Sequence, residues 1–315
     1  MTRAFVFPGQ GSQAVGMGRQ LYDAIPAARL VFEEVDEALG EPLSRLIFDG
    51  PEDVLRLTEN AQPALLATAV AAARALEEVS GKHLPELCTV VAGHSLGEYS
   101  ALAAAGSIGL GEAARLLRLR GQAMQSAVPV GEGAMAAILG LDLPAVEEVA
   151  AAACALGVCD VANDNAPAQV VVSGSRAAVE HAVELAQARG ARRCVLLPVS
   201  APFHCRLLAP AAEAMRTALA EVALGMPSVP VVTNVAAVPE SAPEVLRTRL
   251  VEQVTARVRW RESLLSMAEL GVDTVVELGA GRVLIGLAKR TVPEVSTVAL
   301  GAPEEIDAFV ATLPH

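Results

Sequence analysis

Residues 89–98 read Thr-Val-Val-Ala-Gly-His-Ser-Leu-Gly-Glu, an apolar run that leads into a G-x-S-x-G sequence around Ser95. The run 89–92 predicts a buried strand, and the segment 98–105 predicts a helix directly after it. This context is typical of a nucleophile elbow, a sharp turn that exposes a serine hydroxyl at the start of a helix. The bare pattern also occurs in turns without a catalytic role. We interpret Ser95 as the candidate nucleophile.

Strands and helices alternate on both sides of this stretch. We expect strands at 4–7, 229–233, 273–278 and 296–300, and helices at 62–79, 111–126, 206–222 and 261–270. Continuously apolar strands that are separated by helices indicate a parallel sheet with helices on both faces. The predicted fold class is therefore α/β, with a parallel sheet covered by helices.

The middle of the chain follows a different order. We expect a strand at 134–139, a helix at 144–155, strands at 157–162 and 169–173, a helix at 175–189 and a strand at 192–197. The order β-α-β-β-α-β is that of a ferredoxin-like α+β unit. We therefore predict two domains, a discontinuous α/β core and a ferredoxin-like insert. The core comprises residues 1–127 and 199–315, and the insert residues 128–198.

Composition and charge exclude several classes of protein. Hydrophobic residues make up 53% of the chain and charged residues 19%, which is too apolar for a disordered chain. The 24 Lys and Arg against 36 Asp and Glu leave a formal net charge of −12, which disfavours binding to nucleic acid. The longest run without a charged residue, 222–239, contains a glycine and three prolines, so we expect no membrane-spanning helix.

The cysteines and the N-terminus point to the cytoplasm. The five cysteines are odd in number and form no C-x-x-C pair, which favours reduced thiols over a disulfide framework or a zinc site. The first residues lack the apolar stretch of a secretory signal. We therefore expect a cytoplasmic protein without a bound metal ion.

The loop 8–14 follows the first predicted strand and has two interpretations. Gly9-x-Gly11-x-x-Ala14 satisfies a dinucleotide-binding fingerprint, with the acidic residues of 33–36 about 20 residues further on. Alternatively, the loop directs backbone N–H groups toward an oxyanion, as a second loop does in α/β hydrolases. A serine elbow in the same chain favours the oxyanion loop.

A nucleophilic serine needs a base. Of the histidines at positions 83, 94, 181, 204 and 315, only His204 lies in a loop between a predicted strand and a predicted helix, where catalytic residues are common. A structural histidine is the alternative. The sequence does not single out an acidic residue as the group that orients the imidazole. Asp273 and Glu277 are candidates, and a backbone carbonyl could serve instead.

Arg120 lies on the predicted helix 111–126 among Leu116, Leu117 and Met124. These neighbours indicate a partly buried face, and a buried guanidinium requires an anionic partner. A surface arginine near a helix end is the alternative.

Together these motifs resemble those of the malonyl-CoA:acyl carrier protein transacylases of type II fatty acid synthesis. The resemblance runs from about residue 3 to residue 300 and keeps the order of the motifs. It implies a hydrolase-like acyltransferase core with a ferredoxin-like insert, in agreement with the two domains predicted above. They are Phe7-Pro-Gly-Gln-Gly-Ser-Gln13, Gly93-His-Ser-Leu-Gly-Glu-Tyr-Ser-Ala-Leu102, Arg120-Gly-Gln-Ala-Met-Gln125, Asn163-Asp-Asn-Ala-Pro-Ala-Gln169 and Val199-Ser-Ala-Pro-Phe-His-Cys205.

The resemblance implies roles for the catalytic residues. It makes Ser95 the acylated nucleophile and His204 its base, and it assigns the oxyanion N–H groups to Gln10 and Leu96. The reaction implied is a ping-pong transfer through a malonyl-serine, with malonyl-CoA and acyl carrier protein as partners. No cofactor or metal is implied, and we expect a monomer.

The resemblance also implies substrate-binding and positioning residues. Arg120 grips the malonyl carboxylate, and the backbone carbonyl of Gln253 orients the histidine. The family usually has proline where Arg257 stands, so the chain departs from the pattern there. In related domains an aromatic residue at the position of Phe203 accompanies preference for malonyl over methylmalonyl groups.

Other functions remain possible at this point. A serine thioesterase or hydrolase would use the same nucleophile and base, and the same transfer could serve polyketide synthesis or malonate decarboxylase. A carrier protein with an acidic helix would need a basic patch. The candidates are Arg189, Arg192 and Arg193 in the insert, and Lys289 with Arg290 in the core.

Overall fold

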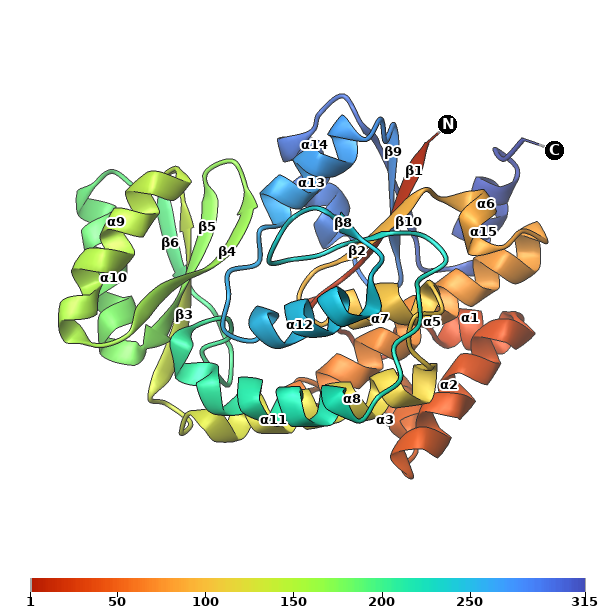
Figure 1. Cartoon of the computed structure of the whole chain (residues 1–315), viewed down its shortest axis with the longest axis horizontal. Helices are drawn as coiled ribbons and strands as arrows, with labels where there is room; N and C mark the ends of the chain where they lie inside the picture. The colour runs from red at the N-terminus through yellow and green to blue at the C-terminus, as the bar shows by residue number, and fades with distance from the viewer. Residues whose placement is uncertain (1, 315) are drawn as a thin grey trace.

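The computed structural model describes residues 2–314 and shows a larger α/β core joined to a smaller α+β unit (Figure 1). Met1 and His315, at the two ends of the predicted core, lie outside the described residues. Within the described part of the chain, no helix is long and apolar enough to cross a membrane. The expected α/β fold class with an added small sheet is confirmed.

The core contains a six-stranded sheet in the order β10-β9-β1-β2-β7-β8. Its strands are β1 (Arg3–Phe7), β2 (Val90–Gly93), β7 (Val231–Val232), β8 (Pro239–Glu240), β9 (Thr274–Leu278) and β10 (Ser296–Leu300). Neighbours pair in parallel except β7 and β8, which are antiparallel. Strand β7 is shorter than the expected 229–233, since Pro230 has no N–H to donate to a ladder.

Helices cover both faces of this sheet (Figure 1). They are α1 (Arg19–Ala24), α2 (Pro26–Leu39), α3 (Leu43–Asp49), α4 (Glu52–Leu55), α5 (Thr58–Ser80), α6 (Leu84–Leu87), α7 (Gly97–Ala104), α8 (Leu110–Ala127), α11 (Ala209–Ala220), α12 (Pro243–Gln253), α13 (Trp260–Glu269), α14 (Val283–Thr291) and α15 (Pro303–Val310). A 3₁₀ turn, η2 (Arg206–Leu208), precedes α11.

Alternate side chains of β1 pack on opposite faces of the sheet. Phe5 and Phe7 belong to the large apolar cluster that includes α2, α5, α7 and α8. Ala4 and Val6 belong to a second cluster that includes α13 and α14. Burial on both faces favours apolar residues along a strand, which explains the unbroken apolar run at residues 4–7.

The smaller unit has the expected β-α-β-β-α-β order. Its elements are β3 (Gly133–Leu139), α9 (Leu143–Ala153), η1 (Cys154–Leu156), β4 (Cys159–Ala166), β5 (Gln169–Ser175), α10 (Arg176–Ala188) and β6 (Arg193–Leu196). The sheet is antiparallel in the order β4-β5-β3-β6, and α9 and α10 pack against it. Strand β4 begins and ends later than the expected 157–162, because its pairing with β5 continues to Ala166. Asn163 also pairs with Val258 of the core.

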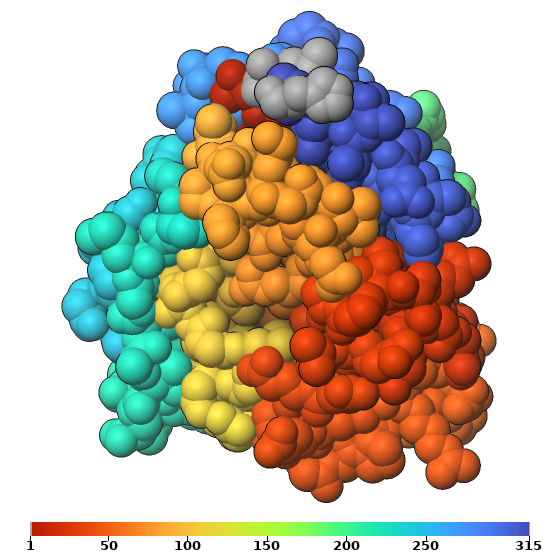
Figure 2. Space-filling view, turned by 90° about the vertical axis from the view of Figure 1, so that its right-hand side faces the viewer, coloured from red at the N-terminus to blue at the C-terminus, as the bar shows by residue number. Residues whose placement is uncertain are grey.

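Segments that are far apart in the sequence meet on the face shown in Figure 2. The N-terminal helices, the segment around α5 and α6 and the C-terminal segment lie side by side there. Helix α15 packs against α1 and α5. The first and last parts of the chain therefore build one continuous core.

Candidate active site

Ser95 stands on a strained turn between β2 and α7. Its φ of 53° lies in the left-handed region, where residues with a side chain are uncommon. A Cβ on Gly93 would collide with the backbone of Gly97, and a Cβ on Gly97 would collide with the Phe7 carbonyl. Both glycines are therefore required by close backbone contacts, as expected for a nucleophile elbow.

Asn234, which the sequence pattern did not single out, holds this turn. Its Oδ1 accepts the backbone N–H of Ser95 at 2.7 Å, and its Nδ2 donates to the Gly93 carbonyl at 2.6 Å. The residue is buried and follows β7, the strand next to β2. Its place at the carboxyl end of a strand is the one sequence signal that could have pointed to it.

Ser95 opens into a cavity of about 630 Å³ between the core and the smaller unit. The core lines it with residues that include Gln10, Leu96, Arg120, Phe203 and His204. The smaller unit adds residues that include Met135, Asn163, Asn165 and Val171. The structure thus brings all the predicted site residues except Gln253 to the wall of one cavity, and Gln253 lies directly behind that wall.

His204 contacts both Ser95 and Gln253. Its Nε2 lies 2.7 Å from the Ser95 Oγ, and its Nδ1 lies 2.8 Å from the backbone oxygen of Gln253. A carbonyl only accepts, so Nδ1 carries the proton and Nε2 is free to accept the serine proton. Burial, and then the positive charge of Arg120, lower the pKa of His204 to about 3.

Neither acidic candidate orients this histidine. Asp273 accepts the backbone N–H of Thr2, and Glu277 accepts the backbone N–H of Ile285 at the start of α14. The backbone oxygen of Gln253 lies at His204 Nδ1, the atom that the carboxylate contacts in a Ser-His-Asp triad.

Arg120 is buried, with 2% of its surface exposed, so the alternative of a surface arginine is wrong. Its guanidinium donates to Gln62 Oε1 at 2.7 Å, to Gln253 Oε1 at 2.9 Å and to Ser95 Oγ at 3.2 Å. Among residues 2–314 no carboxylate forms an ion pair with it. All three partners are neutral, so a buried cation stands beside the nucleophile without a direct counter-ion.

Glu98 contacts Gln253, which is itself a partner of Arg120, and the sequence analysis did not predict this residue. Its Oε2 accepts Gln253 Nε2 at 2.8 Å and the backbone N–H of Asn234 at 2.9 Å. Burial raises the pKa of Glu98 to about 7. Because Gln253 turns its NH₂ group toward Glu98, its Oε1 is left to accept from Arg120. Glu98 therefore sets which way the Gln253 amide faces.

The loop 8–14 lies at the cavity, where Gln10, Gly11 and Gln13 contribute to the wall. The side chain of Gln10 accepts a hydrogen bond from Thr58 Oγ1 at 3.0 Å. The acidic residues at 33–36, which the dinucleotide interpretation needs at a strand end, lie within helix α2. The arrangement favours the oxyanion loop over a dinucleotide site.

His94 is half-buried in the cavity wall beside Ser95. Its Nε2 lies 2.9 Å from Asn165 Oδ1 of the smaller unit, and its ring meets Trp260 edge-on at 5.5 Å between centroids. Burial lowers the pKa of His94. The ring is therefore held between the two units and does not replace His204 as partner of Ser95.

Comparison with known proteins shows which proteins this chain is similar to. A family model described as the acyl transferase domain matches residues 4–308. The chain is 45% identical to the malonyl CoA-acyl carrier protein transacylase of Bacillus subtilis (strain 168), over 98% of this chain and 96% of the relative. The crystal structure of an acyl-carrier-protein S-malonyltransferase from Bartonella henselae has a TM-score of 0.96 and 53% identity, covering 99% of each chain.

A third comparison involves a complex. A chain from the solved complex of a type II polyketide synthase acyl-carrier protein with its malonyl-transacylase has a TM-score of 0.95 and 41% identity. The match covers 99% of this chain and 100% of that chain.

Proposed function

This chain belongs to the acyl transferase family, and we propose that it transfers the malonyl group of malonyl-CoA to the phosphopantetheine thiol of an acyl carrier protein. The transfer supplies fatty acid elongation. The observation that carries the proposal is Arg120, a buried guanidinium 3.2 Å from Ser95 Oγ with only neutral hydrogen-bond partners. A malonyl ester on Ser95 would place its free carboxylate within reach of this cation, and a planar guanidinium matches a carboxylate in geometry and charge.

In the first half of the reaction, Ser95 Oγ attacks the thioester carbonyl of malonyl-CoA while His204 Nε2 accepts the hydroxyl proton. The developing oxyanion is stabilised by the backbone N–H groups of Gln10 and Leu96. The tetrahedral intermediate expels the CoA thiolate, which takes the proton from His204. A malonyl ester remains on Ser95.

In the second half, the thiol of the carrier protein enters the same cavity. It gives its proton to His204 and attacks the malonyl ester, and Ser95 leaves as the alcohol after recovering the proton. The proton returns to its starting place, so the cycle needs no further reactant. We propose that the protein uses no cofactor or metal for this chemistry.

A hydrolase is the main alternative, since water could replace the thiol. Its products would be free malonate and a regenerated serine. A hydrolase of unspecified esters has no need for a cation at the acyl end of the cavity, where Arg120 lies. Transfer in polyketide synthesis or with malonate decarboxylase would use the same residues and differ only in the carrier.

Intact-mass measurement after mixing with malonyl-CoA, acetyl-CoA and methylmalonyl-CoA separately tests the proposal. We expect one malonyl adduct on the wild type, none on Ser95→Ala, and rapid loss of the adduct only when a carrier thiol is added. A labelled Ser95→Ala would place the nucleophile elsewhere. Fast spontaneous loss of the adduct would favour the hydrolase.

Two exposed basic clusters remain candidates for docking the carrier protein. Arg192 and Arg193 are exposed near the start of β6, and the neighbouring Arg189 pairs with Glu148 at 2.7 Å. Lys289 and Arg290 are exposed on α14. Charge reversal in the docking cluster should slow the second half-reaction with the carrier and leave acylation by malonyl-CoA unchanged. We further propose that the protein is a cytoplasmic monomer, which sedimentation and cell fractionation would test.

A further inference from the structure

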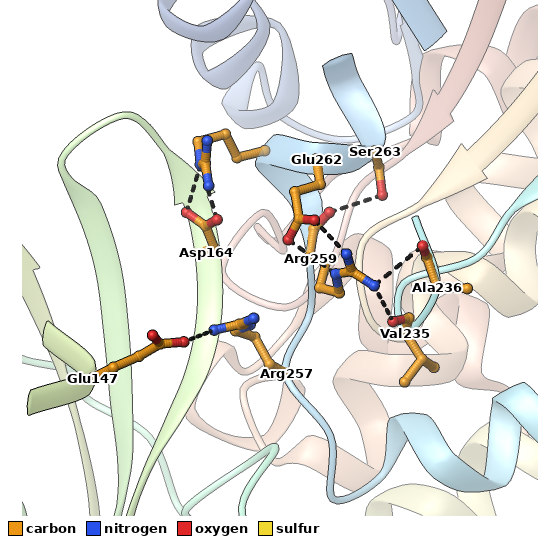
Figure 3. Close-up of polar contacts among 9 residues, drawn as sticks. Glu147, Asp164, Val235, Ala236, Arg257, Arg259, Glu262 and Ser263 are labelled. Carbon is orange, nitrogen blue, oxygen red and sulfur yellow. Dashed lines mark hydrogen bonds and ion pairs between the residues drawn. The ribbon is translucent and has the colours of Figure 1, made fainter. Parts of the chain in front are cut away.

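In the smaller unit, the strand that lines the cavity carries one buried carboxylate, Asp164. Asn163 and Asn165 on β4 line the cavity, and Asp164 stands between them. Asp164 accepts two hydrogen bonds from Arg261 Nε of α13, to Oδ1 at 3.1 Å and to Oδ2 at 2.9 Å (Figure 3). The carboxylate side chain is 1% exposed and the arginine side chain 29%.

Backbone hydrogen bonds set the register of the same contact. The Asp164 N–H donates to the Val258 carbonyl at 2.9 Å, and the Val258 N–H donates to the Ala162 carbonyl at 2.8 Å. The next residue of the core segment, Arg259, donates to the carbonyls of Val235 and Ala236. The end of β4 is thereby attached to a core segment that is itself attached to the loop after β7.

The same two segments also hold His94 beside the nucleophile. Trp260, next to Arg261, is fully buried and meets the His94 ring edge-on. Asn165, next to Asp164, contacts His94 Nε2 from the other unit. Moving β4 away from α13 would therefore release the Asn165 contact and loosen the packing around Trp260.

We propose that Asp164 and Arg261 are positioning residues, which hold the substrate-binding wall of the smaller unit at a fixed distance from Ser95. The inference rests on the proposed function, because it assumes that acyl-CoA binds between the two units. Ser95, His204 and the Gln253 carbonyl all belong to the core, so their mutual contacts do not depend on this pair. Loss of the pair should weaken substrate binding much more than the chemical step.

The chain offers a matched control across the same interface. Arg257 pairs with Glu147 of α9 at 2.6 Å, with side chains 27% and 50% exposed (Figure 3). An exposed ion pair contributes little because water screens it and the long side chains lose freedom. Glu147→Gln removes a salt bridge between the same two units and should change nothing measured below.

The test combines two measurements on Asp164→Asn, Arg261→Met, Arg261→Lys and Glu147→Gln. The first is the rate of Ser95 acylation against malonyl-CoA concentration. The second is the fluorescence of Trp260, the single tryptophan of the chain, which belongs to the same buried apolar cluster as Ala166 of β4 and so reports on the contact between the units. Circular dichroism checks that each variant is folded, and the partly exposed Arg261 variants carry the test if Asp164→Asn does not fold.

For Asp164→Asn and Arg261→Met we expect the half-saturating malonyl-CoA concentration to rise about tenfold to a hundredfold, as a small misplacement of binding groups can cost. The maximal acylation rate should fall less than about threefold, because Ser95, His204 and the Gln253 carbonyl stay in place. Trp260 emission should move to longer wavelength as water reaches the contact. Arg261→Lys should lie between these variants and the wild type, because lysine keeps the charge and loses the Nε–H group that both carboxylate oxygens accept.

Two results would overturn the inference. One is a maximal rate that falls while the half-saturating concentration stays constant. The other is Trp260 emission in both folded variants that matches Glu147→Gln. Failure of the proposed function would look different, because the wild type itself would then not be acylated by malonyl-CoA, whereas the fluorescence result needs no substrate.

Discussion

Arg120 and Gln253 are joined by a hydrogen bond of 2.9 Å from the guanidinium to the side-chain oxygen of the glutamine. The backbone oxygen of the same glutamine accepts a hydrogen bond from the N–H at His204 Nδ1. One residue therefore contacts both the cation that we propose binds malonyl and the base that we propose activates Ser95. A substitution of Arg120 should therefore also change the environment of His204.

Arg120→Ala should discriminate between malonyl and acetyl groups. Loss of one partner of a buried charge pair costs about 2–5 kcal/mol, which corresponds to a fall in kcat/KM for malonyl transfer of roughly 30-fold to several thousand-fold. Acetyl transfer should fall much less, because an acetyl group has no carboxylate to bind. Arg120→Lys should recover only part of the loss. Equal losses for both acyl groups would make Arg120 a structural residue.

Phe203→Ser should relax the preference for malonyl over methylmalonyl. Phe203 is buried in the cavity wall directly before His204. Exclusion of one extra methyl group is typically worth about 1–3 kcal/mol, so the ratio of the two kcat/KM values should fall by about 10-fold to 200-fold without inverting strongly. The measurement is competition between the two CoA esters. An unchanged ratio would show that this ring does not limit the size of the acyl group.

Acylation should depend little on pH across the neutral range. The base must be neutral, and the pKa of His204 is lowered to about 3, so protonation removes the active form only well below pH 5. We expect kcat/KM for acetyl-CoA to be flat from about pH 5 to pH 8, with an acidic limb below about pH 4. Arg120→Met should move this limb to higher pH, because the arginine charge is the second cause of the lowered pKa. An acidic limb near the usual histidine value in the wild type would contradict the assignment.

Glu98→Gln should remove a pH-dependent loss of stability. The pKa of Glu98 is about 7 in the folded protein, above the ordinary 4.5. Between these values the folded state binds more protons than the unfolded state, so stability falls as pH rises through this window. At 1.36 kcal/mol per pKa unit the fall is on the order of 3 kcal/mol.

Urea unfolding of wild type and Glu98→Gln at pH 4.5 and pH 8 measures the effect, and His204 contributes equally to both proteins. The glutamine keeps an acceptor for Gln253 Nε2 and the Asn234 N–H. Glu98→Leu is the contrasting variant, since it leaves both buried donors unsatisfied at about 1–3 kcal/mol each. The prediction fails if Glu98→Gln and the wild type lose stability in parallel from acid to alkaline pH.

Local sequence patterns were enough to predict the fold class and the nucleophile elbow. The unbroken apolar run 4–7 indicates burial on both faces of a sheet, and the glycines around Ser95 indicate a turn with no room for side chains at those positions. His204 could be selected by exclusion because the chain has few histidines. The roles of Gln10, Leu96 and Gln253 came only from the resemblance to a family, and they remain proposals.

The tertiary structure alone decided which distant residues surround Ser95. Asn234 and Gln253 lie 139 and 158 residues further along the chain and contact the Ser95 backbone, and the only local signal for either is that Asn234 follows a strand. The burial of Arg120 and the place of Glu98 behind Gln253 depend on how α7, α8 and α12 pack. The sequence by itself determined the elements and the turn that exposes the serine, because these follow from the conformations and burial of neighbouring residues. The surroundings of the serine needed the assembled fold, because strand order and helix packing bring together groups that are not neighbours in the chain.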